Sequence, residues 1–343
     1  MPVPTFTATT LRAATRPTFY FIGVTTGSSS IQRVFPAWAA ELGLDAQLMG
    51  IDLPLHAPAE DYRRVVEFIR DDPLSLGALV TTHKIDLYRA TADLFDERDW
   101  FSQLMGETSC ISKKDGRLCC HAKDPISSGL ALDAFIPAGY WASHPEASVL
   151  CLGAGGSTIA VSWFLSQKRD AAQHHLPAVA QAEPAATADT LADDRPARII
   201  VTNRSQPRLD HLREVHAQMN TDLGFDYVLS PTPADNDAVV GALPPWSLVV
   251  NATGLGKDAP GSPVTGAAEF PLDGLAWDLN YRGDLVFLDQ ARAQQASRRL
   301  TVEDGWVYFL HGWTRVVAEV FHIDIPTSGA GFDRLSDLAK DAR

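Results

Sequence analysis

A glycine-rich stretch near the middle of the chain has the residue types and spacing that bind a phosphate group. Residues 149–152 form an apolar run, three glycines follow within four positions, and a helical pattern begins directly after them. Glycines let the backbone approach a pyrophosphate without a Cβ clash, and the N–H groups at a helix start stabilise the anion. A tight strand-to-helix turn that binds nothing has the same pattern, and Thr158 departs mildly from the motif's third small position. The candidate phosphate-binding residues are Gly153, Ala154, Gly155, Gly156 and Ser157.

Two arginines follow the next predicted strand, residues 198–202. Asn203, Arg204 and Ser205 come directly after it, and Arg208 stands three residues further on. A site selective for NAD places an acidic residue here to bind the ribose 2′-hydroxyl, and this sequence has none. Arginines can instead hold a 2′-phosphate through charge-assisted hydrogen bonds, which favours NADP, with NAD as the alternative. The other interpretation is that both arginines are solvated residues at a helix start.

The bulk composition is that of an ordinary globular protein. The 343 residues are 45% hydrophobic and 21% charged, and this length favours two domains. A net charge of −13 argues against nucleic acid as a partner, and no apolar run is long enough to span a membrane. The four cysteines lack C-x-x-C spacing, which argues against a zinc site or a disulfide framework. We therefore expect a cytoplasmic protein with no metal that acts on a small molecule as a monomer or homodimer.

Apolar runs and helical patterns alternate along the first part of the chain, which predicts an α/β fold with a mainly parallel sheet. An Asp-Gly pair between two apolar runs, residues 106–111 and 117–121, predicts a hairpin. A helix is predicted over residues 127–135. The preceding strands are expected at 19–24, 46–53 and 77–81, and the helices at 31–43, 61–70 and 85–94.

The same alternation restarts with a strand at residues 148–152. Residues 173–196 interrupt it, because they are rich in Ala, Pro and Asp and lack periodicity, and we expect a flexible insertion there. The later strands are predicted at 198–202, 246–251 and 275–279, and the helices at 157–165, 209–219, 284–296 and 307–320.

Seven segments, in order, make the chain resemble the shikimate dehydrogenase family, including its quinate-using relatives. Four of them lie from residue 149 onward. The glycine loop and the segment beginning at Asn203 resemble the family's G-A-G-G-A and N-R-T segments. Residues 251–256 (N-A-T-G-L-G) and 278–281 (D-L-N-Y) resemble N-A-T-x-x-G and D-x-x-Y. The resemblance adds Asn251, Ala252, Thr253 and Gly305 to the expected cofactor contacts.

The other three segments lie in the first half. Residues 22–23 with the serines at 28–30 resemble the turn that holds the substrate carboxylate. Residues 77–84 (G-A-L-V-T-T-H-K) resemble G-x-N-V-T-x-P-x-K, one residue shorter, and residues 121–124 (H-A-K-D) fall where the family has x-N-T-D. The substrate contacts that the resemblance implies are Ser28, Ser30, Thr81, Ser109, Tyr281 and His311.

Lys84 and Asp124 match the family's catalytic lysine and aspartate. A lysine ammonium can polarise a ketone and supply a proton, and in reverse its amine can accept one. The resemblance implies reversible hydride transfer between NADP(H) and a hydroxylated cyclic carboxylate such as shikimate, and a place in aromatic amino acid biosynthesis.

The family layout also implies a domain organisation. Residues 1–125 and 303–343 would form a substrate domain, and residues 126–302 a Rossmann domain that binds the cofactor. A C-terminal helix would pack back on the first domain, and the active site would lie in the cleft between the two domains.

Three departures from the family bear on specificity. Ser109 and Ala122 stand where the family has asparagines, and His311 replaces a glutamine. A site that pairs buried polar groups discriminates by roughly 10⁴-fold or more, so losing these amides should relax or redirect specificity.

The departures leave two alternatives open. The chain could be a catalytically silent member that binds a cofactor or metabolite. It could also oxidise an amino-substituted ring acid, which the sequence favours less because no extra acidic pair is clearly placed to hold an amine. His311 could equally pack in the core, and the serines at 28–30 could cap a helix.

Overall fold

The computed structural model describes residues 5–167, 194–257 and 259–342 of the chain. These residues form two compact units. Unit 1 comprises residues 1–124 and 312–343, and unit 2 comprises residues 125–311. Among the described residues, no helix has both the length and the apolar character to cross a membrane.

Unit 1 is built on a mixed seven-stranded sheet with the order β1-β3-β2-β4-β6-β7-β5. Strand β4 pairs antiparallel with β6, and β6 pairs antiparallel with β7, so β4 and β7 run in the same direction. The carboxyl ends of β2, β3, β4 and β7 therefore lie on one edge of the sheet, together with the amino end of β6. The strands are β1 (Thr5–Phe6), β2 (Thr18–Gly23), β3 (Gln47–Asp52), β4 (Ser75–Val80), β5 (Glu97–Arg98), β6 (Cys110–Lys114) and β7 (Arg117–His121).

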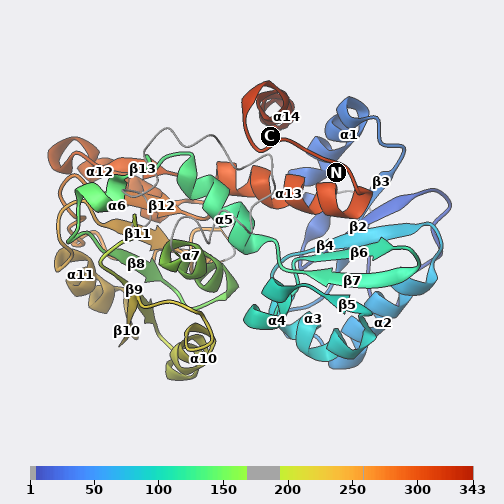
Figure 1. Cartoon of the computed structure of the whole chain (residues 1–343), viewed down its shortest axis with the longest axis horizontal. Coiled ribbons are helices and arrows are strands. Elements are labelled where there is room, and N and C mark those ends of the chain that lie inside the picture. The colour runs from blue at the N-terminus through green and yellow to red at the C-terminus, as the bar shows by residue number, and fades with distance from the viewer. Residues whose placement is uncertain (1–4, 168–193, 258, 343) are drawn as a thin grey trace. The chain divides into compact units, whose positions relative to one another are not determined.

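Helices cover both faces of this sheet, because side chains alternate between the faces along each strand. Tyr20 and Ile22 of β2 belong to the core under α2 (Ala59–Asp71) and α3 (Lys84–Thr91). On the opposite face Phe19 packs edge-on against Trp313 of α13. In Figure 1 the unit 1 strands lie between α1 and α14 above and α2 and α3 below. The remaining elements of this unit are α1 (Ile31–Leu42), α4 (Trp100–Met105), α14 (Gly329–Asp341), η1 (Thr26–Ser28) and η2 (Ala92–Leu94).

Unit 2 is built on a parallel six-stranded sheet with the order β10-β9-β8-β11-β12-β13. Counted from β8, this is the order 3-2-1-4-5-6 of the doubly wound dinucleotide-binding fold, and it confirms the predicted Rossmann fold. The order reverses between β8 and β11, and ligands of such sheets bind at the carboxyl ends of the two strands flanking that point. The strands are β8 (Val149–Leu152), β9 (Arg198–Asn203), β10 (Gly224–Leu229), β11 (Leu248–Asn251), β12 (Leu275–Asp278) and β13 (Thr301–Glu303).

The sheet of unit 2 is buried on both faces, as parallel sheets require. Leu150 and Val249 contribute to an apolar cluster with Val240 of α11 and Phe287 of α12. The helices of this unit are α5 (Asp124–Asp133), α6 (Tyr140–Ser143), α7 (Gly156–Ser166), α10 (Gln206–His216), α11 (Pro233–Gly241), α12 (Val286–Arg298) and the first part of α13 (Trp306–Phe321).

Helix α13 contributes to both units. Phe309 in its first half packs against Tyr281 of unit 2, whereas Trp313 in its second half packs on β2 of unit 1. The chain therefore returns from unit 2 to unit 1 inside this helix, after residue 311. The expected boundary was at residue 303. The second half of α13 and α14 belong to unit 1, as expected of a C-terminal helix that returns to the first domain.

The predicted elements agree with the structure in type, and they differ mostly by a few residues at their ends. Strand β10 and helix α11 were not predicted, and neither were the terminal α14 and the short elements α4, α6, β1, β5 and β13. Most of the expected insertion at residues 173–196 lies outside the described residues. In its last part, Asp194 is buried and accepts hydrogen bonds from the amides of Gly139 and Ala142.

All four cysteines of the chain are buried and free. Burial is the main cause that raises the pKa of each thiol, to about 12 for Cys120 and Cys151, and it also raises those of Cys110 and Cys119. The thiol form is therefore favoured at neutral pH, and none of these side chains is a candidate nucleophile.

Candidate functional site

Lys84 and Asp124 meet at one edge of the unit 1 sheet. Lys84 opens α3 after a short link that follows β4, and Asp124 opens α5 after a short link that follows β7. Since β4 and β7 run in the same direction, their carboxyl ends bring together two residues that lie forty positions apart. Nζ of Lys84 donates a hydrogen bond to Oδ2 of Asp124, and their side chains are only 19% and 8% exposed. The structure thus places together the two residues that the sequence predicted as catalytic.

The environment of Lys84 favours its charged form. Burial acts to lower the pKa of the ammonium, but the charges of Asp124 and Glu107 and the hydrogen bond to Asp124 outweigh it, so the pKa is raised. A lysine of this kind is well suited to donate a proton at neutral pH and less suited to accept one.

Glu107 is a third ionisable group at this edge, and the sequence reasoning missed it. Its side chain is 0% exposed, and neither carboxyl oxygen has a hydrogen-bond partner. Burial and the charge of Asp124 raise its pKa to about 7, and the positive charge of Lys84 partly opposes that rise. A glutamate between Gly106 and Thr108 at the start of a predicted hairpin has the sequence signature of an ordinary surface residue.

Ser109 positions the backbone next to Asp124. Its hydroxyl oxygen accepts a 2.7 Å hydrogen bond from the backbone N–H of Lys123, and Ser109 is buried. The side chain of Lys123 turns to Glu319, 2.8 Å away. Ala122 is also buried, and like Ser109 it stands where the family has an asparagine.

Thr81 and Thr82 form the link between β4 and Lys84. The amide of Thr81 donates to the carbonyl of Ile22, and its carbonyl accepts from the amide of His83. Thr82 is exposed and has φ of 57°, a conformation that is strained for a β-branched residue. The backbone therefore turns sharply in the link between β4 and Lys84.

The serines predicted to hold a substrate carboxylate lie in the turn after β2, on the same edge. Ser28 is exposed and its hydroxyl donates to the carbonyl of Thr25. Ser30 precedes α1, and no side-chain hydrogen bond caps that helix. The turn is held mainly by Asp52, whose Oδ1 accepts from both the amide and the hydroxyl of Thr26 at 2.7 and 2.6 Å.

In unit 2 the glycine turn follows β8, at the point where the strand order reverses. Gly153 has φ of 107°, and its amide donates to the carbonyl of Thr202. A Cβ atom on Gly153 would lie 2.9 Å from the carbonyl oxygen of Ala252, so only glycine fits. The hydroxyl of Thr158 donates a 2.6 Å hydrogen bond to the carbonyl of Gly153. The departure at Thr158 thus has a structural role, because its hydroxyl ties the helix to the turn.

The start of α7 suits a pyrophosphate group. The helix begins at Gly156 with Gly155 before it, and no side chain caps its first amides. A Cβ atom at Gly155 would meet nothing within 4 Å, so the space above this backbone is open. Uncapped N–H groups facing open space are the arrangement that binds a phosphate anion, and the residues present therefore fit a dinucleotide.

The segment after β9 presents two positive charges next to this turn in the sheet. The side-chain oxygen of Asn203 accepts from the amide of Ser205 and fixes the start of α10. Arg204 and Arg208 are exposed, and neither guanidinium forms an ion pair with another described residue. Both remain free to contact a phosphate.

The residues after β11 lie on the other side of the reversal point. Asn251 accepts hydrogen bonds from the amide and the hydroxyl of Thr253, and it donates to Oδ1 of Asp278. The amide of Ala252 donates to the carbonyl of Leu152, next to the glycine turn. Burial raises the pKa of Asp278 to about 6, against the opposing effect of its hydrogen bonds.

Three further predicted site residues lie in or beside α13. The ring of Tyr281 packs against Phe309 with centroids 4.5 Å apart, so it belongs to an aromatic cluster. Gly305 allows a close approach, because a Cβ there would lie 2.1 Å from the carbonyl oxygen of Leu279. His311 is buried, which agrees with the core-packed interpretation as well as with a substrate contact.

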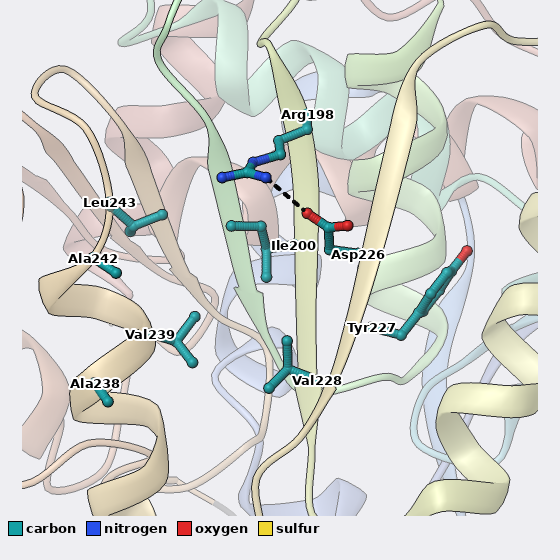
Figure 2. Close-up of a pocket in the computed structure, with 9 residues that line it drawn as sticks. All are labelled: Arg198, Ile200, Asp226, Tyr227, Val228, Ala238, Val239, Ala242 and Leu243. Atoms are coloured by element: carbon teal, nitrogen blue, oxygen red, sulfur yellow. Dashed lines mark hydrogen bonds and ion pairs between the residues drawn. The ribbon is translucent and has the colours of Figure 1, made fainter.

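A groove elsewhere in unit 2 carries no comparable chemistry. Figure 2 shows it between the edge strand β10, its neighbour β9 and helix α11, where Arg198 forms an ion pair with Asp226 at 3.2 Å. Its other lining residues are apolar apart from Tyr227, and it starts at the amino end of β9, whereas the glycine turn lies at the carboxyl end.

Comparison with known proteins shows the fold. No protein-family model matches the chain, and no curated protein matches it in sequence. Among solved structures, shikimate dehydrogenase from Aquifex aeolicus is 17% identical with a TM-score of 0.66, over 97% of this chain and 99% of the other.

Two further structures agree. Shikimate 5-dehydrogenase from Thermus thermophilus, in complex with NADP(H) and shikimate, is 22% identical with a TM-score of 0.63, over 95% of this chain and 99% of the other. Quinate dehydrogenase from Corynebacterium glutamicum, in complex with NAD, is 17% identical with a TM-score of 0.63, over the same shares of each chain. The chain therefore has the fold of shikimate and quinate dehydrogenases, and the resemblance read from its sequence is confirmed at the level of the fold.

Proposed function

We propose that this protein is an NADP-dependent oxidoreductase that transfers hydride reversibly between NADP(H) and a hydroxylated cyclic carboxylate, shikimate with its 3-dehydro ketone or a relative. The observation that carries the proposal is the buried ion pair between Lys84 and Asp124. It stands in a chain whose second unit places a glycine turn at the reversal point of a Rossmann sheet.

Lys84 is the proton donor and acceptor of the reaction. In ketone reduction its ammonium polarises the carbonyl and gives its proton to the oxygen, and in alcohol oxidation its amine takes the proton back. Asp124 orients Nζ through the hydrogen bond between them. The same carboxylate favours the ammonium form, so the site is set for reduction near neutral pH.

The cofactor would be held by unit 2. When bound, a nicotinamide dinucleotide supplies or accepts the hydride. The amides at the start of α7 would bind its pyrophosphate, with Gly155 leaving room for the close approach. Arg204 and Arg208 would bind a 2′-phosphate, and this supports NADP over NAD.

The substrate specificity should differ from that of a strict shikimate dehydrogenase. Ser109 directs its hydroxyl oxygen to a backbone amide, and Ala122 has no polar side chain. The site therefore has fewer groups that could pair with substrate hydroxyls, and we expect weaker discrimination among ring polyols.

The proposal is tested by following NADP⁺ reduction with shikimate, quinate and a small panel of cyclic polyols, with NAD⁺ in parallel. We expect turnover with at least one substrate and a fall of roughly 10²- to 10⁴-fold in Lys84→Ala. Lys114→Ala removes an exposed lysine from β6 and serves as the matched control that should retain full activity. Absence of turnover with every substrate of the panel would reject the proposed dehydrogenase activity.

A second candidate is a catalytically silent protein that binds the cofactor or a metabolite. Ser109 and Ala122 stand where the family has asparagines, and the absence of these two side-chain amides favours this function. This function predicts NADP⁺ binding without turnover, and binding that Lys84→Ala leaves unchanged.

A further inference from the structure

We propose that Glu107 is a third ionisable member of the Lys84 site, and that its charge determines how readily Lys84 gives up or takes up a proton. Glu107 acts through Lys84 and does not contact the substrate, so it is a positioning residue. The consequence for turnover rests on the function proposed above, whereas proton uptake by Glu107 itself does not.

The backbone places Glu107 beside the ion pair. It comes directly before the loop into β6, whose amino end shares the sheet edge with the carboxyl ends of β4 and β7. The amide of Thr108 donates a 3.2 Å hydrogen bond to the carbonyl of Lys84, so the residue after Glu107 is tied to the first residue of α3.

The carboxyl of Glu107 is buried without a hydrogen-bond partner. Both of its oxygens are inaccessible to solvent and neither accepts a hydrogen bond. Burial without hydrogen bonds disfavours the ionised form of a carboxyl and favours the protonated form. A buried acid without hydrogen-bond partners next to a lysine is the kind of departure from ordinary stability rules that marks functional sites.

The charge balance of the site depends on this carboxyl. With Glu107 ionised, two carboxylates surround one ammonium and hold its proton tightly. With Glu107 protonated, Lys84 faces only Asp124 and can release its proton more easily. The pKa of Glu107, raised to about 7 by burial and Asp124, puts the change between these two states at neutral pH.

Within the described part of the chain, the neighbouring elements supply no other charge that acts on Glu107. Beside Lys84 on α3, His83 is buried and bonded to the hydroxyl of Tyr62, and burial lowers its pKa, so it is neutral at pH 7.

The carboxylate of Asp99, at the start of α4, accepts from the amide of Ser102 and lies 3.6 Å from His121. Lys123 is paired with Glu319. Lys84 and Asp124 are therefore the charges that act on Glu107 among the described residues.

The experiment compares pH profiles of kcat/KM in both directions for the wild type, Glu107→Gln and Glu60→Gln. Glu107→Gln keeps the shape and removes the charge, and Glu60 is exposed on α2 and serves as the control. We expect Glu107→Gln to lower the pKa of Lys84, so that the limb on which alcohol oxidation rises with pH moves to lower pH and oxidation at pH 7 is roughly three- to tenfold faster. Reduction should fail at correspondingly lower pH, and Glu60→Gln should follow the wild type. Unchanged limbs in Glu107→Gln would overturn the proposal.

A second measurement needs no turnover. NMR of protein carrying ¹³C-labelled glutamate carboxyls should show one glutamate that titrates near pH 7, absent in Glu107→Gln. Its midpoint should rise in Lys84→Met, because the neighbouring positive charge is gone. Absence of such a signal overturns the proposal. If Glu107→Gln does not fold, the comparison of wild type with Lys84→Met still tests the proposal, because the midpoint near pH 7 should rise in Lys84→Met. Loss of turnover on every substrate with the titration present would reject the proposed reaction alone.

Discussion

The hydroxyl of Ser109 accepts a hydrogen bond from the backbone amide of Lys123, the residue directly before Asp124. Ser109 immediately precedes β6 and Lys123 follows β7, so this bond closes the end of the hairpin on which Asp124 stands. The side chain that occupies a position expected to contact substrate thus holds the carboxylate partner of Lys84 in place.

Replacing Ser109 with alanine should damage both stability and catalysis. The backbone N–H of Lys123 would lose its hydrogen bond to Ser109, at a cost of about 0.5–1.5 kcal/mol in the free energy of unfolding. Asp124 would also be less well placed, so kcat should fall while the KM for cofactor stays constant. Urea unfolding and steady-state kinetics measure the two effects. Ser297→Ala, on the exposed face of α12, should change neither, and a Ser109→Ala protein with wild-type stability and kcat would remove the positioning role.

Two glycines of the cofactor turn should respond differently to alanine. At Gly153 a Cβ would collide with the carbonyl of Ala252 in a left-handed conformation, so Gly153→Ala should lose about 1–3 kcal/mol of stability. At Gly155 the Cβ enters open space, so Gly155→Ala should fold normally but bind NADP⁺ much more weakly.

Thermal unfolding separates the two effects, since it is measured without cofactor, and fluorescence titration then gives NADP⁺ affinity. Equal affinity of Gly155→Ala and the wild type would mean that no phosphate approaches this turn.

The two arginines after β9 should determine the choice between cofactors. Arg204→Ala or Arg208→Ala should weaken NADP⁺ binding by roughly ten- to a hundredfold, the value of a charge-assisted hydrogen bond, and leave NAD⁺ binding unchanged. Arg292→Ala, on α12, removes an exposed guanidinium and is the control. Isothermal titration with both cofactors measures the difference. If both cofactors weakened equally or neither did, these guanidiniums would be solvated surface groups.

His216 should make the protein sensitive to acid. It is buried between the hydroxyls of Ser162 and Tyr227, 2.7 and 2.8 Å from its ring nitrogens, and burial lowers its pKa to about 4. A histidine with a lowered folded-state pKa contributes stability above its unfolded value of about 6.5, and that contribution is lost as pH falls toward 4.

Between pH 7 and 4.5 the wild type should therefore lose about 2–3 kcal/mol that His216→Gln does not lose. Urea unfolding at the two pH values gives the comparison, and parallel pH dependence in both proteins would show that His216 does not titrate in this way.

Much of the candidate site could be expected from the sequence because its residues follow strand ends. The glycine turn and the segment after β9 were expected from their residue types, and Lys84 and Asp124 from the resemblance. All of them stand near the carboxyl ends of strands. Glu107 could not be predicted, because its significance comes from burial and from the packing of three distant segments.

The missed elements have a different explanation. Strand β10 lies at the edge of the sheet and contains Asp226, so it lacks the continuous apolar run of a central strand, although Phe225, Tyr227 and Leu229 alternate. Helix α11 carries a recognisable start signal, since Thr232 and Asp235 form a capping box with Pro233 between them.

The buried thiols give the chain a practical property. Because Cys110, Cys119, Cys120 and Cys151 are buried and favour the protonated form, maleimide reagents should leave them unmodified in the folded protein. A cysteine introduced at an exposed position in each unit, such as Lys114 and Arg292, could then carry a donor and an acceptor dye without removing any native residue of the core. Energy transfer between such dyes would report whether the distance between the labelled positions changes when a candidate ligand is added.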